Sequence, residues 1–419
     1  MIGTCRRSSW TATGINWPRK QKRCSARWRF YQHVCSRMQK KRILIFSTAY
    51  VPFVGGAEVA IREITDRIGE YEFVMITAKM DRKLPSVETV GNIEVHRIGW
   101  GIPMLDKLFL ALFGHVYALR LHTRRPVSMI WSMMASYSGF AALSMKNKTG
   151  LPFLLTLQEG DPIEYIMRRV RFVKKRFVKI FTQADGLQAI STYLLHWGEQ
   201  MGFAGIVKEV VPNGVDVERF TKEYSPSEIE ELRKSFGFPE NAVILVTASR
   251  LVVKNGIVHV IRALKDLPEN VCFVICGTGE LEHDLKDMTQ ELGLASRVVF
   301  AGNKSHAELP KVLKACDIFI RPSLSEGLGN AFLEAMAAGL PTIGTMVGGI
   351  PDFLEDGKTG FACKPGDPAS IVQVVNTITR GSVCAKEQMY ERAMKRIEEQ
   401  YNWPSICEEM NSIFKTLVP

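Results

Sequence analysis

The strongest constraint on the fold is an alternation, from Arg42 onward, of short β-rich apolar runs with longer amphipathic segments. This alternation is typical of parallel sheets covered by helices, because each pair of parallel strands needs a crossover between them. The first half contains strand-like runs at residues 43–46, 73–76, 93–98, 129–131, 153–157 and 187–190. The second half restarts the pattern at 243–247, 271–276, 298–300, 318–320, 342–343 and 360–362. We therefore predict two similar α/β units in tandem.

A charged segment containing Pro, Gly and Asn, residues 212–241, separates the two series and marks a boundary. Helical periodicity runs from Lys386 to Leu417 and is interrupted at residues 402–404, which predicts two terminal helices with a sharp bend. A chain of 419 residues is long enough for each unit to bury its own core. The predicted organisation is a tail at 1–41, an N-terminal domain at 42–212, a C-terminal domain at 213–401 and a terminal helix at 402–419.

The formal charge of +11 is concentrated at the start of the chain. Residues 1–42 hold twelve Lys or Arg and no acidic residue, and the rest of the chain carries 42 basic and 43 acidic side chains. The charge therefore gives no indication of a nucleic-acid partner. Residues 1–37 have neither a helical nor a strand period, so we expect them to be disordered or dispensable. An over-extended reading frame explains them most simply, and a transit peptide or a basic tether are the alternatives.

The nine cysteines contain no C-x-x-C spacing, which favours a reduced, intracellular protein without a disulfide framework or a zinc site. The tail has no apolar core of a secretory signal, and no stretch reaches the length of a spanning helix. The longest apolar candidate, Leu108–Leu119, is interrupted by Gly114 and His115 and is expected to be a buried or interfacial helix. We expect a cytoplasmic protein that is able to lie on the inner face of a membrane.

The most informative motif is residues 325–335, which follow the run at 318–320 and precede a helix. Its two glycines let the backbone approach a ligand, and the N–H groups at the start of the following helix suit a pyrophosphate. Glu326 and Glu334, eight residues apart, can contact different parts of a long ligand. The alternative is a surface loop with one exposed glutamate and one on a helix face.

Two cations, Arg250 and Lys254, follow the run at 243–247, at the edge where doubly wound sheets bind ligands. They could neutralise a diphosphate leaving group in place of magnesium, or form a solvated basic turn. Gly277 and Gly279 also follow a strand-like run. Tight turns between a strand and a helix often use glycine for geometry alone, so this pair is a weak signal.

The first half offers two further candidates. Gly55 and Gly56 begin the first helix, where they could face a diphosphate from the opposite domain or form a plain N-terminal turn. Gln158 and Glu159 come directly after the run at 153–157. Polar residues at the carboxyl end of such a strand face a cleft more often than a core.

Together these features resemble family 4 of the retaining glycosyltransferases, from about Arg42 to the C-terminus. Five motifs occur in the order and spacing of that family, namely Gly55-Gly56, Val211 to Asp216, Arg250 to Gly256, Gly277-Thr278-Gly279, and the Glu326/Glu334 pair. The resemblance implies an α/β GT-B fold, in which two Rossmann-like, doubly wound domains face a cleft. It also implies that the C-terminal helix crosses back to the first domain.

The resemblance also implies roles for single residues. Arg250 and a neighbouring lysine would hold the diphosphate, Glu334 the ribose hydroxyls, and Glu326 the hydroxyls of the transferred sugar. The other residues expected to bind the donor are Gly55, Gly56, Asn255, Gly277, Gly279, Gly327, Leu328, Gly329 and Asn330.

Two departures from the family pattern concern the site. The family usually has lysine directly before the glycine of the diphosphate turn, whereas here Asn255 occupies that place and Lys254 stands one residue earlier. The family often has His followed by Asp after the strand at 153–157, whereas this chain has Gln158 and Glu159. Gln158 is therefore the fourth candidate catalytic residue, beside Glu326, Arg250 and Lys254.

The resemblance further implies transfer with retention by front-face displacement, in which the leaving phosphate helps to accept the proton of the acceptor. No metal, cofactor or protein nucleophile is then required. The implied partners are a nucleotide-sugar donor and a glycan or lipid-linked acceptor, as in polysaccharide or glycolipid biosynthesis.

Residues 163–180 combine an apolar stripe with seven basic residues, Arg168, Arg169, Arg171, Lys174, Lys175, Arg176 and Lys179. A basic amphipathic helix of this kind suits an anionic membrane surface or a lipid-linked acceptor. The alternative is a helix that packs on the core and exposes a solvated basic face. Lys174 falls within the apolar stripe, which weakens the membrane interpretation.

Three other functions share parts of this pattern. A sugar-nucleotide epimerase has the same shape, but the paired glutamates argue against it. A phosphorylase would need pyridoxal phosphate. A catalytically silent sugar-nucleotide or membrane-binding module is favoured only by Gln158.

Overall fold

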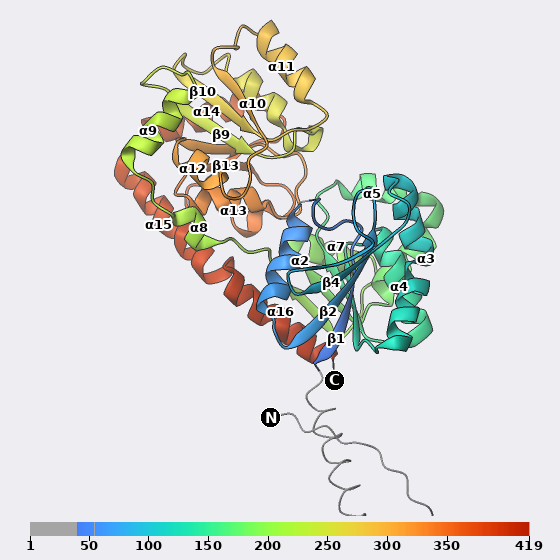
Figure 1. Ribbon diagram of the computed structural model, residues 1–419. Coiled ribbons are helices and arrows are strands. Elements are labelled where there is room, and N and C mark those ends of the chain that lie inside the picture. The colour runs from blue at the N-terminus through green and yellow to red at the C-terminus, as the bar shows by residue number, and fades with distance from the viewer. Residues whose placement is uncertain (1–39, 54, 419) are drawn as a thin grey trace, which may run out of the picture. The chain divides into compact units, whose positions relative to one another are not determined.

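The computed structural model describes residues 40–53 and 55–418, so the predicted tail at 1–39 lies outside the described residues. The described chain from Arg42 onward belongs to one compact unit built on two sheets (Figure 1). The strands of the first sheet are β1 (Lys41–Phe46), β2 (Tyr71–Ala78), β3 (Val87–Val90), β4 (Ile93–Ile98), β5 (Met129–Met133), β6 (Phe153–Leu157), β7 (Gly186–Ala189) and β8 (Val207–Val210). Those of the second sheet are β9 (Val243–Ala248), β10 (Val271–Cys276), β11 (Val298–Gly302), β12 (Ile318–Arg321), β13 (Thr342–Thr345) and β14 (Phe361–Cys363).

Both sheets are doubly wound, as predicted. The first has the order β3-β4-β2-β1-β5-β6-β7-β8 and is parallel except for the antiparallel pair β3–β4. The second has the order β11-β10-β9-β12-β13-β14, and its strand pairs are parallel. The strand order reverses between β1 and β5 and between β9 and β12, and ligands bind at the carboxyl ends of strands near such switch points.

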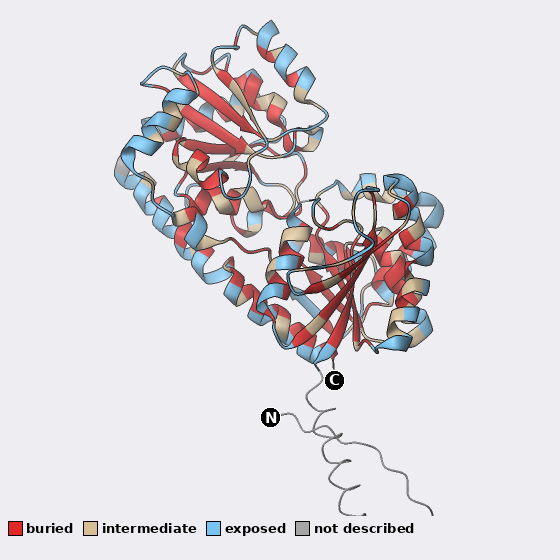
Figure 2. Ribbon diagram, in the orientation of Figure 1, coloured by how far each residue is buried: buried red, intermediate tan, exposed pale blue. Residues whose placement is uncertain are grey.

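Helices cover both sheets, so that the inner strands are buried and the helices expose one face to solvent (Figure 2). Those of the first half are α2 (Gly56–Arg67), α3 (Pro103–Arg124), α4 (Tyr137–Thr149), α5 (Ile163–Arg169), η1 (Arg171–Val173), α6 (Lys174–Thr182) and α7 (Thr192–Gln200). Those that follow are α8 (Val217–Thr221), α9 (Pro226–Ser235), η2 (Val253–Asn255), α10 (Ile257–Ala263), α11 (Glu282–Glu291), α12 (Leu309–Lys314), α13 (Asn330–Ala337), η3 (Ile350–Asp352), α14 (Pro368–Arg380), α15 (Val383–Gln400) and α16 (Trp403–Leu417).

Two strands, β3 and β8, were not predicted. β3 has no buried residue, and in β8 only Val207 is buried. Both lie at the edges of their sheet, where one face or one side is open to solvent and the sequence needs few apolar residues. Their short, polar sequences therefore lack the apolar signal that reveals the inner strands.

The prediction of one amphipathic helix at 163–180 is wrong, because the segment forms α5, the 3₁₀ turn η1 and α6. α5 and η1 have no buried residue, whereas Phe177, Ile180 and Phe181 of α6 are buried. Ile166 and Val170, before Lys174, are partly buried against the same core cluster that contains Phe177 and Ile180, and they also line a cavity.

The C-terminal helix crosses back to the first sheet, as predicted. Asn402 caps α16 by accepting a hydrogen bond from the backbone N–H of Ser405 at 2.9 Å, which produces the bend after α15. Trp403 and Phe414 of α16 are buried in the cluster that also contains residues of β1 and β2. In Figure 1 this helix runs beside α2 and the first sheet.

The apolar run at 108–119 forms part of the surface helix α3. Leu108, Leu112 and Phe113 are about half exposed, while Leu110 is fully buried. The expectation of a buried helix is therefore met only in part, because one side of α3 is buried and the other is exposed. Within residues 40–53 and 55–418, no helix has the length and apolar character needed to cross a bilayer.

Candidate functional site

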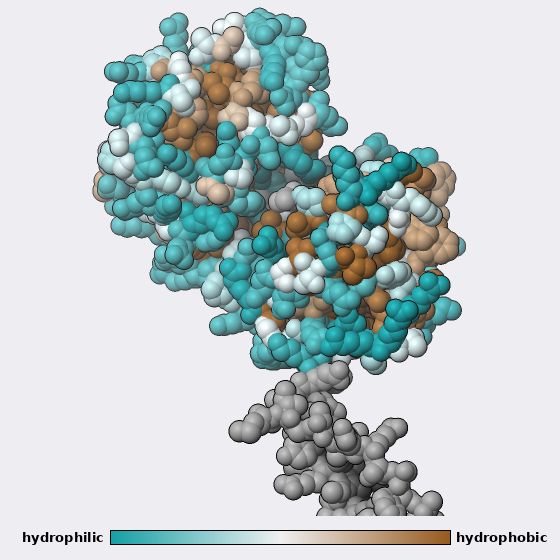
Figure 3. Space-filling model, viewed as in Figure 1, coloured by the Kyte–Doolittle hydropathy of each residue, from teal (hydrophilic) through white to brown (hydrophobic). Residues whose placement is uncertain are grey.

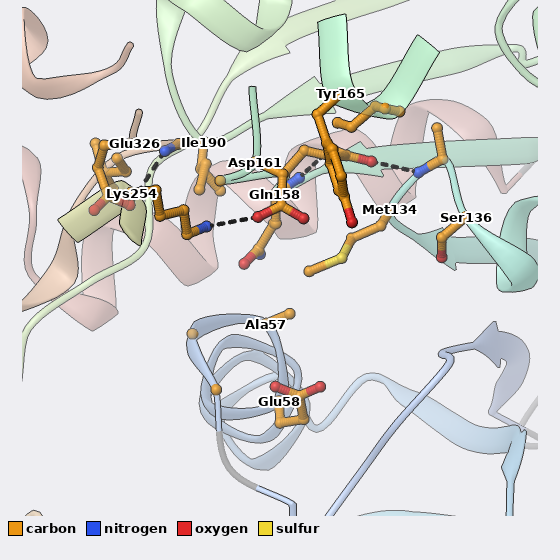
Figure 4. Close-up of a pocket in the computed structure, with 18 of the residues that line it drawn as sticks. Ala57, Glu58, Met134, Ser136, Gln158, Asp161, Tyr165, Ile190, Lys254 and Glu326 are labelled. Carbon is orange, nitrogen blue, oxygen red and sulfur yellow. Dashed lines mark hydrogen bonds and ion pairs between the residues drawn. The ribbon is translucent and has the colours of Figure 1, made fainter. Parts of the chain in front are cut away.

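A cavity of about 900 Å³ lies among loops at the carboxyl ends of strands from both sheets (Figure 4). The loop after β6 and the start of α2 form its wall on the side of the first sheet. The loops after β9 and β12 and the start of α13 form the other wall. Of the predicted site residues, the cavity is lined by Gly55, Gly56, Gln158, Arg250, Lys254, Asn255, Glu326, Gly327, Leu328, Gly329 and Asn330.

The two predicted diphosphate cations differ in their surroundings. The Arg250 guanidinium has no hydrogen-bond or ion-pair partner among the residues that the structure describes. Lys254 Nζ forms an ion pair with Asp161 Oδ1 at 2.9 Å, drawn as a dashed line in Figure 4. Asn255 is buried, and its side-chain amide donates to the Arg250 carbonyl at 2.6 Å. Asn255 thus fixes the turn that presents both cations.

Glu326 is held by Arg321, a residue that the sequence analysis did not select. Arg321 Nη2 donates to Glu326 Oε2 at 2.7 Å, and its guanidinium lies 4.7 Å from the centre of the Phe332 ring. Arg321 is 6% exposed, and its Nε has no partner among the described residues. The available signal was an arginine at the end of the apolar run Ile318–Ile320, where a charged residue is costly unless it is paired.

The loop before α13 needs its glycines for close approach. Gly329 has a φ of 104°, and a Cβ there would lie 2.8 Å from the Phe332 ring. A Cβ on Gly327 would lie 2.5 Å from the Glu159 carbonyl of the opposite wall. Asn330 and Ala331, at the start of α13, line the cavity, so an anion can reach the backbone N–H groups of this helix end.

Gln158 is engaged at both ends of its amide. Its Nε2 donates to Asn213 Oδ1 at 3.1 Å, and Asn213 Nδ2 donates to Gln158 Oε1 at 3.2 Å. Asn213 Nδ2 also approaches Asn330 Oδ1 at 3.4 Å. Gln158 therefore links the end of β6 to the segment that joins the two sheets and to the start of α13.

Glu159 is buried and holds two loops together. Its carboxylate accepts hydrogen bonds from the backbone N–H of Ala135 at 2.6 Å and of Gln158 at 2.9 Å. Burial raises the pKa of Glu159 to about 7, against the opposing effect of these N–H groups. The residue supports the cavity wall after β5 and β6.

Glu58, a second residue that the sequence analysis did not select, lies on the wall opposite Lys254 and Asp161 in Figure 4. It stands in the first turn of α2, two residues after Gly56. Burial raises the pKa of Glu58, while backbone N–H groups and the charge of Arg250 oppose the shift. Its position two residues after a glycine pair at a helix start was a usable signal.

Gly277, Gly279 and Glu334 do not line this cavity. A Cβ on Gly277 would lie 1.9 Å from the Ser249 carbonyl oxygen, and one on Gly279 would lie 2.4 Å from that of Leu251. Both glycines therefore allow two turns of the second sheet to pack closely, which is the geometric alternative for this motif. Glu334 lies one turn into α13, where burial raises its pKa and the nearest ion-pair partner, His306, is 3.9 Å away.

Among the described residues, no cluster of three or more His, Cys, Asp or Glu side chains has the arrangement of a metal site. The charged side chains of the cavity wall include two ion pairs, Lys254 with Asp161 and Arg321 with Glu326, beside Arg250 and Glu58. Such a wall can bind a phosphate group and several hydroxyl groups at the same time.

Comparisons with known proteins agree with this arrangement. The family model for Glycosyltransferase Family 4 matches residues 54–219, and the model for Glycosyl transferases group 1 matches residues 228–398. The two matches lie on the first and second sheets respectively.

Similar sequences also carry glycosyltransferase names. An uncharacterized glycosyltransferase of Methanocaldococcus jannaschii is 31% identical over 209 residues, which are 49% of this chain and 53% of that protein. The chain thus matches about half the length of the first curated relatives. A GDP-mannose-dependent monoacylated alpha-(1-6)-phosphatidylinositol monomannoside mannosyltransferase of Corynebacterium glutamicum is 23% identical over 90% of this chain and 98% of its own length.

Among solved structures, the Anabaena HepE protein in complex with UDP-glucose has a TM-score of 0.73 and 20% sequence identity. The match covers 90% of this chain and 99% of that one. This likeness concerns the fold. Two doubly wound sheets, a C-terminal helix that returns to the first of them and family models that match residues 54–219 and 228–398 identify the chain as a member of the family 4 glycosyltransferases with the GT-B fold.

Proposed function

We propose that the protein transfers a hexosyl group from a nucleoside-diphosphate sugar to a hydroxyl group of an acceptor, with retention of anomeric configuration. The observation that carries this proposal is the meeting of Arg250, Lys254 and the start of α13 around one cavity that also contains Glu326. Cations and helix N–H groups bind phosphates, whereas a carboxylate binds sugar hydroxyls. The Anabaena protein, solved in complex with UDP-glucose, and the Corynebacterium protein, named as GDP-mannose-dependent, support a nucleotide-sugar donor.

In the proposed reaction the acceptor oxygen bonds to the anomeric carbon on the face from which the diphosphate departs. The bond between that carbon and the phosphate oxygen breaks, and the departing phosphate accepts the acceptor's proton. Arg250, Lys254 and the N–H groups of α13 would neutralise the charge that develops on the diphosphate. Glu326, fixed by Arg321, would hold the sugar hydroxyls during transfer.

We further propose that the reaction needs neither a metal ion nor a cofactor, because protein cations are in place to neutralise the diphosphate. The decisive test is a screen of UDP-, GDP- and ADP-sugars for an increase in melting temperature, followed by product analysis in EDTA. A donor at a hundred times its dissociation constant stabilises the folded state by about 2.7 kcal/mol. Activity that EDTA abolishes and magnesium or manganese restores would contradict this mechanism.

We also propose that the acceptor, a glycan or a lipid-linked molecule, binds on the side of the first sheet, and that the protein works at the cytoplasmic face of a membrane. The basic residues of 163–180 support this, since Arg168, Lys174 and Lys175 have no ion-pair partner among the described residues and would attract anionic lipids. The Corynebacterium relative is named for a phosphatidylinositol monomannoside acceptor.

A silent binding module is the second candidate, and the amide pair of Gln158 and Asn213 favours it. A glutamine side chain does not titrate. Because both ends of this amide are hydrogen-bonded to Asn213, Gln158 is also not free to approach a sugar. Donor binding without transfer to any acceptor, together with activity in a Gln158→His variant, would establish the silent module. Transfer by the natural protein would exclude it.

A further inference from the structure

The cavity extends beyond the cations into an apolar arm. In Figure 4, Lys254 and Glu326 lie on one side of Asp161, while Tyr165 and Ser136 lie on the other. α3, α4, α5 and η1 line this second part with Leu108, Leu112, Tyr137, Phe140, Tyr165, Ile166, Val170 and Val173. The proposed reaction needs a place for the acceptor, and this arm is the part of the cavity that the diphosphate cations do not line.

Two arginines stand in the wall of the apolar arm. The Arg169 guanidinium lies 5.7 Å from the centre of the Tyr165 ring, and that of Arg176 lies 5.9 Å from the centre of the Phe140 ring. Arg176 also donates to Ser144 Oγ at 2.8 Å. Neither arginine has an ion-pair partner among the residues that the structure describes.

The acidic residues of the cavity wall are engaged by other groups, and Glu58 interacts with backbone N–H groups and with the charge of Arg250. Asp161 pairs with Lys254, Glu326 with Arg321, and the Glu159 carboxylate with backbone N–H groups. Two unpaired arginines on an apolar wall are complementary to an anion that is attached to an apolar group.

The residues around the arm also form an apolar surface. Leu105, Leu108, Leu112 and Phe113 of α3 are 45–52% exposed, and Phe172 of η1 is 86% exposed. Figure 3 shows hydrophobic residues gathered at the edge of the molecule where Figure 1 places α3. Because a sugar polymer needs polar partners along its length, an apolar wall of this kind suits a hydrocarbon chain better.

We propose that this arm is the acceptor site, and that Arg169 and Arg176 bind the phosphate of an acceptor whose hydrocarbon group lies against α3 and η1. The proposal rests on the proposed glycosyl transfer and specifies its acceptor as an amphiphile that contains a phosphate. Both an isoprenyl phosphate and a phospholipid have this chemistry. A glycan without a lipid does not.

The first test is binding of farnesyl phosphate, below its micelle concentration, measured by calorimetry on the whole chain without membranes. Arg169→Gln combined with Arg176→Gln should lower its affinity by about tenfold or more, because two charge-assisted hydrogen bonds are lost. The matched control, Arg124→Gln combined with Lys148→Gln, removes the same charge from exposed residues that do not line the cavity and should stay within about twofold. An equal loss of affinity in the two double variants would show that general electrostatic attraction causes the effect. It would contradict the proposed phosphate site.

A second pair of variants tests the hydrocarbon contact. Leu112→Gln should weaken farnesyl phosphate, whereas Val116→Gln, one turn along α3 and outside the cavity, should not. Farnesol should bind more weakly than farnesyl phosphate, and inorganic phosphate should not compete at equal concentration. Farnesol binding as tightly as farnesyl phosphate would refute the phosphate contact, and inorganic phosphate binding as tightly would refute the hydrocarbon contact.

Transfer assays separate this proposal from the proposed function. The Arg169/Arg176 double variant should keep the donor affinity of the natural protein and lose transfer to a phosphatidylinositol or isoprenyl phosphate acceptor in detergent. A natural protein that binds farnesyl phosphate but no nucleotide sugar would refute the glycosyl transfer and leave the amphiphile site standing. One that transfers sugar efficiently to glycans alone, and does not bind farnesyl phosphate, would refute the acceptor site and leave the transfer standing.

Discussion

At the scale of single residues, the cavity contains charges that differ in how they are engaged. Arg250 has no partner for its guanidinium among the described residues, while Lys254 and Arg321 each bind a carboxylate. An unpaired cation does not have to release a protein partner when an anionic ligand arrives. Arg250 is therefore the side chain in this site that is best prepared to receive a diphosphate.

The first prediction follows from that difference. Arg250→Ala should lower the rate of glycosyl transfer by about two orders of magnitude or more. The variant loses the positive charge that stabilises the negative charge developing on the leaving diphosphate. Steady-state rates in the presence of EDTA measure the effect, with Arg262→Ala, an exposed arginine of α10, as the control. A loss of less than about threefold would show that another group neutralises the diphosphate.

The second prediction concerns Glu159 and pH. Burial raises its pKa from 4.5 to about 7, so between these values the folded state holds a proton that the unfolded state has released. The contribution of Glu159 to the free energy of unfolding should therefore be largest below pH 4.5. It should decrease as the pH rises from 4.5 to about 7. The contribution is on the order of 3 kcal/mol at most.

Urea unfolding at pH 5 and pH 8 tests this with Glu159→Gln. Glutamine has one acceptor oxygen for the N–H groups of Ala135 and Gln158, so the variant should be less stable at both pH values by about 1–3 kcal/mol. Its stability should change less between the two pH values than that of the natural protein. Glu164→Gln, which removes an exposed acid of α5, should retain the natural pH dependence, and an equal dependence in Glu159→Gln would contradict the assignment.

At the scale of elements, sequence predicts the buried parts of this fold better than its edges and turns. The predicted strand runs all overlap strands of the structure, including the edge strands β11 and β14, because each of them carries apolar residues that reach the core. The edge strands β3 and β8, and the break between α5 and α6, depend on tertiary surroundings that local sequence does not encode. The same holds for Arg321, whose role appears only when Glu326 lies beside it.

The third prediction concerns the start of α3, the helix that carries the apolar wall of the arm. Asp106 is fully buried and accepts hydrogen bonds from the backbone N–H groups of Met80, Trp100, Gly101 and Ile102 at 2.7–3.1 Å. Asp106→Ala leaves these donors without their acceptor and should lower the free energy of unfolding by about 2–4 kcal/mol.

Chemical denaturation measures that loss, and Lys107→Ala provides a neighbouring control that should change stability by less than about 0.5 kcal/mol. The Asp106 variant should also bind farnesyl phosphate less tightly, since the loop before α3 is no longer held. A stability equal to that of the control would mean that the loop finds other acceptors for its N–H groups.

At the scale of the whole molecule, the chain passes between the two sheets twice, near residues 211–216 and near 401–403. The two passages touch each other, since the N–H of Val215 donates to the carbonyl of Tyr401 at 2.7 Å. Gly214 lies against the ring of Trp403, where a Cβ would approach to 2.7 Å. The sequence indicated both passages, through the motif at 211–216 and the interruption at 402–404. It did not predict that the two passages contact each other. The two passages therefore join the sheets at one place. Loops from both sheets come together a second time around the cavity.

The ion pair of Lys254 and Asp161 is one of those contacts across the site, because Lys254 follows β9 and Asp161 follows β6. Asp161 is the group that a donor diphosphate must replace if Lys254 is to bind it.

Asp161→Asn removes the competing charge and should therefore tighten binding of the donor's nucleoside diphosphate by about twofold to fivefold, as expected for a pair that is partly exposed. Calorimetric titration at low and high salt measures the change, which should shrink as salt screens the pair. Glu164→Gln removes an exposed acid of α5 that does not line the cavity and has no ion-pair partner among the described residues, and it should leave the affinity unchanged. Weaker binding by Asp161→Asn alone would mean that Asp161 holds Lys254 in place for the donor instead of competing with it.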